Sequence, residues 1–203
     1  MDADPIEIRV LGCLIEKQRT TPDTYPLTLN SLRLACNQAT NREPVVDYDE
    51  ETIREALQRL WRKEWARLAS GQGSRSVKYR QLVQDTLALA DDEISILCVL
   101  MLRGPQTPGE LKQRSDRLHP FGELAEVEET LERLIPRDLV ARLARRPGQK
   151  EERYAHLLGG EVDDTAEAET PRPVLARDPL EERVAALEVE VAALRAALTD
   201  LGL

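Results

Sequence analysis

The sequence predicts a helix-dominated α+β fold built from two similar units in tandem, and three observations predict it. The segment that begins at Glu7 repeats at Glu93 with the same apolar positions. Amphipathic helical patterns with capping signals then follow in the same order in both halves. Each half closes with two short alternating segments around Gly or Pro, which is typical of a β-hairpin. Because the repeat, capping and turn signals agree, they indicate one architecture used twice.

The first predicted helix of each unit carries its apolar residues at helical spacing. Residues 7–15 (EIRVLGCLI) align with residues 93–101 (EISILCVLM), and both are apolar at the i, i+3, i+4 and i+7 positions of one face. Cys13 and Cys98 lie among Leu, Ile and Val in these segments, so we expect both thiols in the core. Cys36 stands beside Asn37 at a predicted helix end. It is the cysteine that we expect to be exposed.

Two further helices are predicted in each unit. The second helix follows Thr28 in one unit and Thr107 in the other, where Thr107 and Glu110 form a capping-box pair with Pro108 between them. We expect the ring of Trp65 in the core, because it occupies the place of Leu139 in the other unit. The apolar face of the third helix recurs at matched positions: Ile53, Leu57, Leu60 and Trp65, then Val127, Leu131, Leu134 and Leu139.

Each unit ends in a predicted hairpin, which completes the order of a winged helix. Residues 66–68 and 77–80 form the predicted strands of the first hairpin, and residues 140–143 and 153–156 those of the second. We therefore predict a winged-helix domain at 4–83 and another at 88–158. An acidic, Pro-containing linker is predicted at 159–178, and an amphipathic heptad helix at 179–203.

Two motifs in the first unit resemble a known family. Residues 21–32 (TPDTYPLTLNSL) and 35–45 (ACNQATNREPV) are similar to the signature of the YceH-like family of uncharacterised bacterial proteins. The resemblance extends over most of residues 4–158. It implies two winged-helix domains and a cytoplasmic bacterial setting, and it brings no established activity, substrate or ligand.

Several classes of protein are excluded by composition. The 203 residues include three Cys and two His, His119 and His156, which is too few for a disulfide framework or a zinc site. The longest apolar run, residues 96–102, is too short to span a membrane, and the acidic N-terminus does not resemble a signal peptide. No hydrolase, nucleotide-binding or zinc-protease motif occurs. We therefore expect a cytoplasmic protein that is not an enzyme, has no cofactor or metal and has no contact with a membrane.

Charge along the chain points to a basic patch in the first unit. The net charge is −9, but residues 159–203 hold 11 acidic and 4 basic residues, so most of the acidity lies in the tail. Residues 59–80 hold seven basic residues against Glu64 alone. A phosphate backbone binds such a patch through counterion release. The candidates for backbone contacts with double-stranded DNA are Arg59, Arg62, Lys63, Arg75, Lys78 and Arg80.

The same unit carries side chains suited to base edges, and acidic residues that oppose DNA. Amide and guanidinium groups pair with base edges in the major groove. The candidate base-reading residues are Asn37, Gln38, Asn41 and Arg42. However, both predicted third helices begin with several carboxylates, which repel phosphates, although they also complement the helix dipole. Two functions stay open: a DNA-associated, transcription-regulator-like protein, and a winged-helix scaffold that binds protein partners. An enzyme or a small-molecule sensor is the third alternative.

The last segment predicts dimerisation. Its heptads place β-branched residues or Leu at a and Leu at d, which favours parallel dimers. Pairs of opposite charge at e and g agree with a homodimer. The alternative is a helix that docks on the domains of its own chain. The predicted dimerisation residues are Leu180, Val184, Leu187, Val191, Leu194, Leu198 and Leu201.

Overall fold

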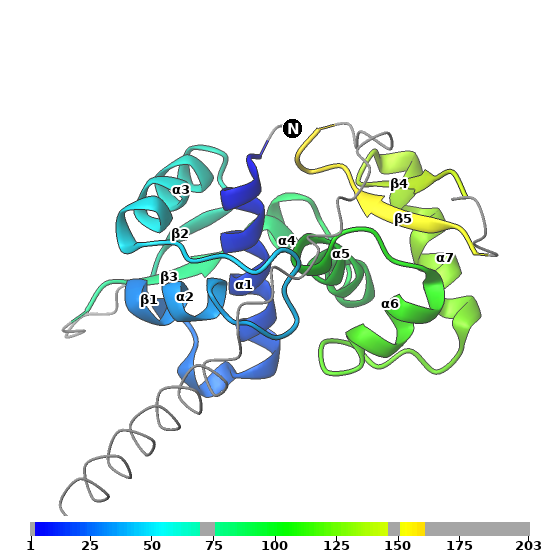
Figure 1. Ribbon diagram of the computed structural model, residues 1–203, viewed down its shortest axis with the longest axis horizontal. Coiled ribbons are helices and arrows are strands. Elements are labelled where there is room, and N and C mark those ends of the chain that lie inside the picture. The colour runs from blue at the N-terminus through cyan, green and yellow to red at the C-terminus, as the bar shows by residue number, and fades with distance from the viewer. Residues whose placement is uncertain (1–2, 70–75, 146–150, 161–203) are drawn as a thin grey trace, which may run out of the picture. The chain divides into compact units, whose positions relative to one another are not determined.

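The computed structural model describes residues 3–69, 76–145 and 151–160 (Figure 1). These residues belong to one compact unit, Met1–Val162. Helices dominate it and short antiparallel strands complete it, which confirms the predicted helix-dominated α+β class. The predicted linker beyond Gly160 and the predicted heptad helix at 179–203 lie outside the described residues.

Helix α1, Pro5–Thr20, is the central helix of the first half. It begins with a capping box, in which Asp4 accepts a hydrogen bond from the Glu7 backbone N–H (2.8 Å) and Glu7 accepts one from that of Asp4 (2.9 Å). Pro5 suits the first helical position because the missing N–H would have no helical partner there. All residues from Glu7 to Ile15 are buried, so neighbouring elements surround this part of the helix.

The first half continues with two capped helices and a small sheet. Thr28 caps the second helix by accepting from the Ser31 N–H (3.2 Å), and Asp49 caps the third by accepting from the Thr52 N–H (2.8 Å). The sheet has the antiparallel order β1-β3-β2. In chain order the elements are η1 (Pro22–Thr24), β1 (Leu27–Thr28), α2 (Leu29–Cys36), α3 (Glu50–Arg62), β2 (Ala66–Leu68), β3 (Lys78–Gln81) and α4 (Val83–Thr86).

The second half repeats this order. Thr107 and Glu110 form the predicted capping box at the start of its second helix. Gln106, just before that helix, makes an antiparallel bridge to Tyr154, at the place that β1 takes in the first half. The elements are α5 (Asp91–Arg103), α6 (Pro108–Ser115), α7 (Leu124–Leu134), η2 (Ile135–Arg137), β4 (Val140–Leu143) and β5 (Arg153–His156), so both predicted hairpins form.

The third helix of each half ends in the same tight turn. Helix α3 ends at Arg62, three residues before the end that the apolar pattern suggests. Glu64 then takes the left-handed conformation (φ 59°), as Asp138 does in the second half (φ 53°). This turn lets the Trp65 N–H donate to the Leu60 carbonyl oxygen (2.9 Å) and directs the chain into β2.

The two tryptophans have opposite environments. Trp65 is 3% exposed, which confirms the prediction that its ring belongs to the core. Trp61 is 66% exposed on α3. The turn after α3, rather than the helix itself, brings Trp65 into the core. The two rings therefore do not share one buried face.

Helices α1 and α5 join the two halves. The Cys98 thiol donates to the Gly12 carbonyl oxygen (3.4 Å), and a Cβ added at Gly12 would lie 2.8 Å from Leu102 Cδ2. Glycine at this position therefore permits the close approach of the two helices. Cys13 and Cys98 are fully buried, as predicted. Cys36 is buried too, which corrects the expectation of an exposed thiol, because the last turn of α2 packs on α1.

Candidate functional site

Two of the predicted DNA-contacting cations are held by carboxylates of the protein. Lys63 Nζ lies 2.6 Å from Glu7 Oε1, and Arg59 Nη2 lies 2.9 Å from Asp4 Oδ2. Glu7 is buried, so its charge depends on these cations for compensation. Arg59 and Lys63 therefore tie α3 to the start of α1.

The other basic residues of the patch that the structure describes are exposed or partly exposed and are not held in ion pairs. Arg62 is exposed on α3, and Lys78 and Arg80 are partly exposed on β3. Within the described residues, no ion pair involves these three side chains or Arg67. Arg75 lies outside the described residues.

Exposed carboxylates cover the start of α3. Asp49 is its N-cap, and Glu50, Glu51 and Glu55 are exposed on its first turns. The interaction with the Thr52 N–H lowers the pKa of Asp49, so this carboxylate stays charged. Helix α7 has the same character, with exposed Glu126, Glu128, Glu129 and Glu132. Both helices thus present negative charge at the end that a recognition helix inserts into the major groove.

The candidate base-reading residues take part in internal hydrogen bonds. Asn37 ends α2 and holds the following loop, since its amide donates to the Tyr48 carbonyl oxygen (2.8 Å) and accepts from the Tyr48 N–H (2.9 Å). Gln38 Oε1 accepts from Arg42 Nη2 (3.0 Å). Asn41 has a left-handed backbone (φ 61°) and its side chain accepts from Arg103.

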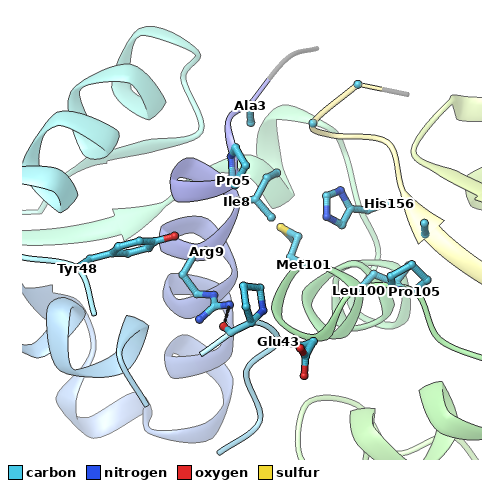
Figure 2. Close-up of a pocket in the computed structure, with 15 residues that line it drawn as sticks. Ala3, Pro5, Ile8, Arg9, Glu43, Tyr48, Leu100, Met101, Pro105 and His156 are labelled. Carbon is cyan, nitrogen blue, oxygen red and sulfur yellow. Dashed lines mark hydrogen bonds between the residues drawn. The ribbon is translucent and has the colours of Figure 1, made fainter. Parts of the chain in front are cut away.

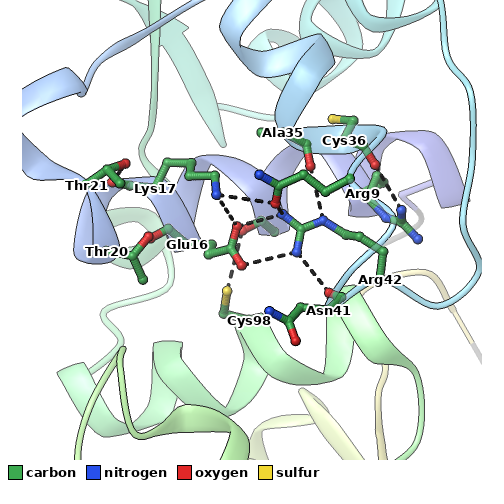
Figure 3. Close-up of polar contacts among 12 residues, drawn as sticks. Arg9, Glu16, Lys17, Thr20, Thr21, Ala35, Cys36, Asn41, Arg42 and Cys98 are labelled. Atoms are coloured by element: carbon green, nitrogen blue, oxygen red, sulfur yellow. Dashed lines mark hydrogen bonds and ion pairs between the residues drawn. The ribbon is translucent and has the colours of Figure 1, made fainter.

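Arg42 lies at the centre of a polar network under this loop (Figure 3). Its guanidinium donates to both carboxylate oxygens of Glu16 (3.1 and 2.6 Å) and to the Ala35 carbonyl oxygen (3.1 Å), and its side chain is 0% exposed. Burial raises the pKa of Glu16, but the hydrogen bonds and charge of Arg42 outweigh it and hold that pKa below its usual value. The Arg42 guanidinium is therefore saturated by groups of the folded chain, and its base-reading role stays a prediction.

A groove lies between α3 and the β2–β3 hairpin on this surface. It encloses about 310 Å³. Trp61 and Leu68, which border it, are 66% and 58% exposed, and Val77 nearby on the hairpin is 50% exposed. We call it the α3–hairpin groove, and it is lined by Arg54, Leu57, Gln58, Trp61, Ala66, Arg67, Leu68 and Tyr79.

The charge of the α3–hairpin groove is positive. Arg54 and Arg67 line it, and no carboxylate is among the lining residues. Arg54 pairs with Glu51 on the outer side of α3, while Arg67 is exposed on β2. Sequence reasoning missed this groove, although one signal points to it. Trp61 directly follows the buried Leu60, so the helical rotation of about 100° places it beside the apolar stripe.

Neither a metal centre nor a membrane-spanning helix occurs in the part of the chain that the structure describes. No three His, Cys, Asp or Glu side chains there are grouped closely enough to hold a metal ion. None of the described helices has the length and apolar composition needed to cross a bilayer. His119 packs edge-on against Phe121, with ring centroids 4.8 Å apart, which is a structural contact.

Comparison with known proteins gives consistent matches. The family model described as "Protein of unknown function, DUF480" matches residues 3–149. The UPF0502 protein YceH of Salmonella paratyphi B is 47% identical over 202 residues, covering 96% of this chain and 94% of the relative. The UPF0502 proteins YceH of Salmonella enteritidis and Salmonella typhimurium match to the same extent.

Proposed function

This chain belongs to the DUF480 family of proteins of unknown function, and we propose that it is a non-enzymatic interaction protein built from two winged-helix units. Its α3–hairpin groove binds an amphipathic, acidic segment of a partner protein. This is the scaffold function that the sequence leaves open beside DNA binding.

The order of elements supports the winged-helix assignment. Each half runs helix, short strand or bridge, helix, helix and β-hairpin. In the first half β1 pairs with β3, so the strand before α2 joins the hairpin in one sheet. In the second half the Gln106 bridge to Tyr154 has the same place. A helix-turn-helix followed by a β wing has this order.

The observation that supports this function most directly is the exposed Trp61, which borders a groove lined by two arginines. Exposed apolar patches of this kind mark interaction sites, and Trp and Arg are the residues most enriched at the energetic centres of interfaces. An apolar side chain of the partner fills the groove beside Leu57 and Tyr79. Acidic residues of the partner pair with Arg67, which has no carboxylate partner in the described residues, whereas Arg54 already pairs with Glu51. Charge complementarity therefore selects an acidic segment over a basic one.

Peptide selection on the full chain tests this function. A phage-displayed library of random peptides is selected on the wild-type protein, and an enriched peptide is then labelled for fluorescence anisotropy. We expect enriched peptides to combine apolar and acidic residues. Trp61→Ala should weaken their binding about tenfold or more, the usual effect at an interface centre. Leu34→Ala is the matched control, because Leu34 is an exposed apolar residue (56%) on α2, away from the groove lining.

Three outcomes contradict the proposed function. Enriched peptides without acidic residues would exclude the charge argument, and binding that is insensitive to Trp61 would exclude the groove. A dimer that dissociates in the Trp61→Ala variant would show that the groove binds a second copy of the chain. Light scattering coupled to size exclusion measures that last outcome.

Double-stranded DNA is the second candidate partner, and one observation favours it. Arg62, Lys78 and Arg80 are without ion-pair partners in the described residues, so they are available to phosphates. Anisotropy with a labelled random duplex tests it, because each phosphate neutralised adds about 0.9 to the slope of log affinity against log salt concentration. Arg62→Glu and Lys78→Glu should reduce that slope. No binding below about 10⁻⁴ M at low salt excludes this candidate.

A further inference from the structure

A cavity of about 330 Å³ lies between the two halves of the described unit (Figure 2). Helix α1 contributes Ile8 and Arg9, helix α5 contributes Leu100 and Met101, and the end of β5 contributes His156. The loop before α3 closes another side with residues 43, 44 and 48. The volume is at the lower end of the range of small-molecule sites, and the lining is mostly apolar, as in such sites.

Arg9 gives this cavity a buried positive charge, and Glu43, the carboxylate among the lining residues, is exposed and forms no ion pair with it in the described part of the chain. The residue is 4% exposed, and its guanidinium donates to the carbonyl oxygens of Cys36 (3.1 Å) and Pro44 (2.5 Å). Its Nε is buried without a hydrogen-bond partner. Within the described residues, no carboxylate oxygen lies within 4.0 Å of an Arg9 nitrogen. A buried charge of this kind is costly unless an anion pairs with it.

The internal repeat shows that the fold does not need an arginine here. Ser95 occupies the equivalent position on α5, and its hydroxyl donates to the Asp91 carbonyl oxygen (2.6 Å) within its own helix. The equivalent site in the second half is therefore satisfied locally. An arginine at this position is therefore specific to the first half, where it lines the cavity, and is not required by the repeated fold.

His156 supplies a second unpaired polar group on the β5 side of the cavity. Its Nδ1 is buried without a hydrogen-bond partner. Burial lowers the pKa of His156 to about 4, so the imidazole is neutral at pH 7 and offers one donor and one acceptor nitrogen. Figure 2 shows its ring directed toward Met101 and Ile8, across the cavity from Arg9.

We infer that this cavity binds a small monocarboxylate with an apolar body. The carboxylate pairs with the guanidinium of Arg9, whose planar fork matches two carboxylate oxygens. The apolar body packs against Ile8, Leu100 and Met101. A hydroxyl group at the far end of the ligand hydrogen-bonds to His156. This site is separate from the α3–hairpin groove, so the inference does not depend on the proposed peptide partner.

The two methionines of the chain provide a direct assay. Met1 and Met101 are its two methionines, and Met101 lines the cavity. Full-length protein labelled with ¹³C at the methionine methyl groups therefore gives a Met101 resonance that reports on the cavity. The probes are hexanoate, 4-hydroxybenzoate and hexanamide. We expect hexanoate and 4-hydroxybenzoate to shift the Met101 resonance saturably.

Neutral probes and variants separate charge recognition from apolar filling. Hexanamide should bind about tenfold more weakly than hexanoate, since it lacks the charge that Arg9 recognises. Arg9→Gln should remove this preference, and His156→Phe should weaken 4-hydroxybenzoate but not hexanoate. If Arg9→Gln does not fold, the comparison of hexanoate with hexanamide on the wild-type protein still shows whether the cavity recognises the carboxylate charge. Equal binding of both, or no saturable shift up to about 10 mM carboxylate, overturns the inference.

Discussion

Lys63 Nζ lies 2.6 Å from Glu7 Oε1, and this ion pair joins the end of α3 to the first turn of α1. The second half repeats the arrangement, with Arg137 Nη1 3.1 Å from Glu93 Oε2. Glu7 and Glu93 also accept hydrogen bonds at the starts of α1 and α5. Each buried carboxylate thus caps one helix and holds the end of another.

We predict that Lys63→Met destabilises the protein by about 1–3 kcal/mol, because it leaves the Glu7 carboxylate with a weaker compensating charge. Arg62→Met is the matched control: Arg62 is the exposed neighbour, and its replacement should change stability by less than about 0.5 kcal/mol. Urea unfolding followed by circular dichroism measures both. Equal stability of the two variants would show that the Glu7–Lys63 pair is not structural.

The two tryptophans give a second matched pair. Trp65→Ala should cost about 3–5 kcal/mol, because it removes a buried ring and leaves a cavity. Trp61→Ala should leave the melting temperature almost unchanged, since the Trp61 side chain is mostly exposed. Differential scanning calorimetry provides the measurement. A large loss in Trp61→Ala would mean that this ring is part of the core, which would also remove it from the α3–hairpin groove.

The pair of Glu16 and Arg42 predicts a pH dependence of stability. The pKa of Glu16 is lower in the folded chain than its usual value of 4.5, so its contribution is complete above that value and is lost as pH falls through the folded pKa. Glu16→Gln should be about 3 kcal/mol less stable at pH 7, because Arg42 stays buried without its partner. The difference from wild type should shrink at pH 3.

Urea unfolding at pH 7, 5, 4 and 3 measures this difference. Glu132→Gln, on the exposed face of α7, is the control and should follow the wild type at each pH. A constant difference between Glu16→Gln and wild type at all four values would contradict the assigned role of the Glu16 charge.

The predicted heptad helix lies outside the described residues, and its test uses the full chain. Its seven apolar residues would each cost about 1.5 kcal/mol or more if they stayed in water, so they require a buried seam. We predict that truncation after Asp178 converts a dimer into a monomer, measured by light scattering coupled to size exclusion. The same subunit count in both chains would favour the alternative, a helix that docks on its own chain.

Much of the fold follows from local signals in the sequence. The capping box of Thr107 and Glu110, and the alternating strands at 140–143 and 153–156, require neighbours only a few residues away. The internal repeat supports each predicted element, because the same signals occur at equivalent positions in both halves. The end of α3 is the exception, because the left-handed turn at Glu64 shortens a helix whose apolar pattern continues to Trp65.

The candidate site was less predictable because it depends on contacts between distant residues. Arg42 has the side-chain chemistry of a base-reading residue. However, both of its terminal nitrogens donate hydrogen bonds to Glu16, 26 residues earlier in the sequence. The same holds for Lys63, a predicted DNA-contacting residue whose partner Glu7 is 56 residues away in the sequence. Composition reveals the presence of a cation, whereas only the tertiary structure reveals whether a carboxylate already holds it. The groove and the cavity are products of packing in the same way.

The contact between α1 and α5 has the form of a two-fold interface. Gly12 and Cys98 occupy equivalent positions in the repeat, and they contact each other. In a symmetric dimer, residues on the axis meet their own copies in this way, and the interface is self-complementary. One chain here holds the arrangement that two identical half-length chains would form through their first helices. The equivalent positions Arg9 and Ser95 mark where the two halves of this arrangement differ.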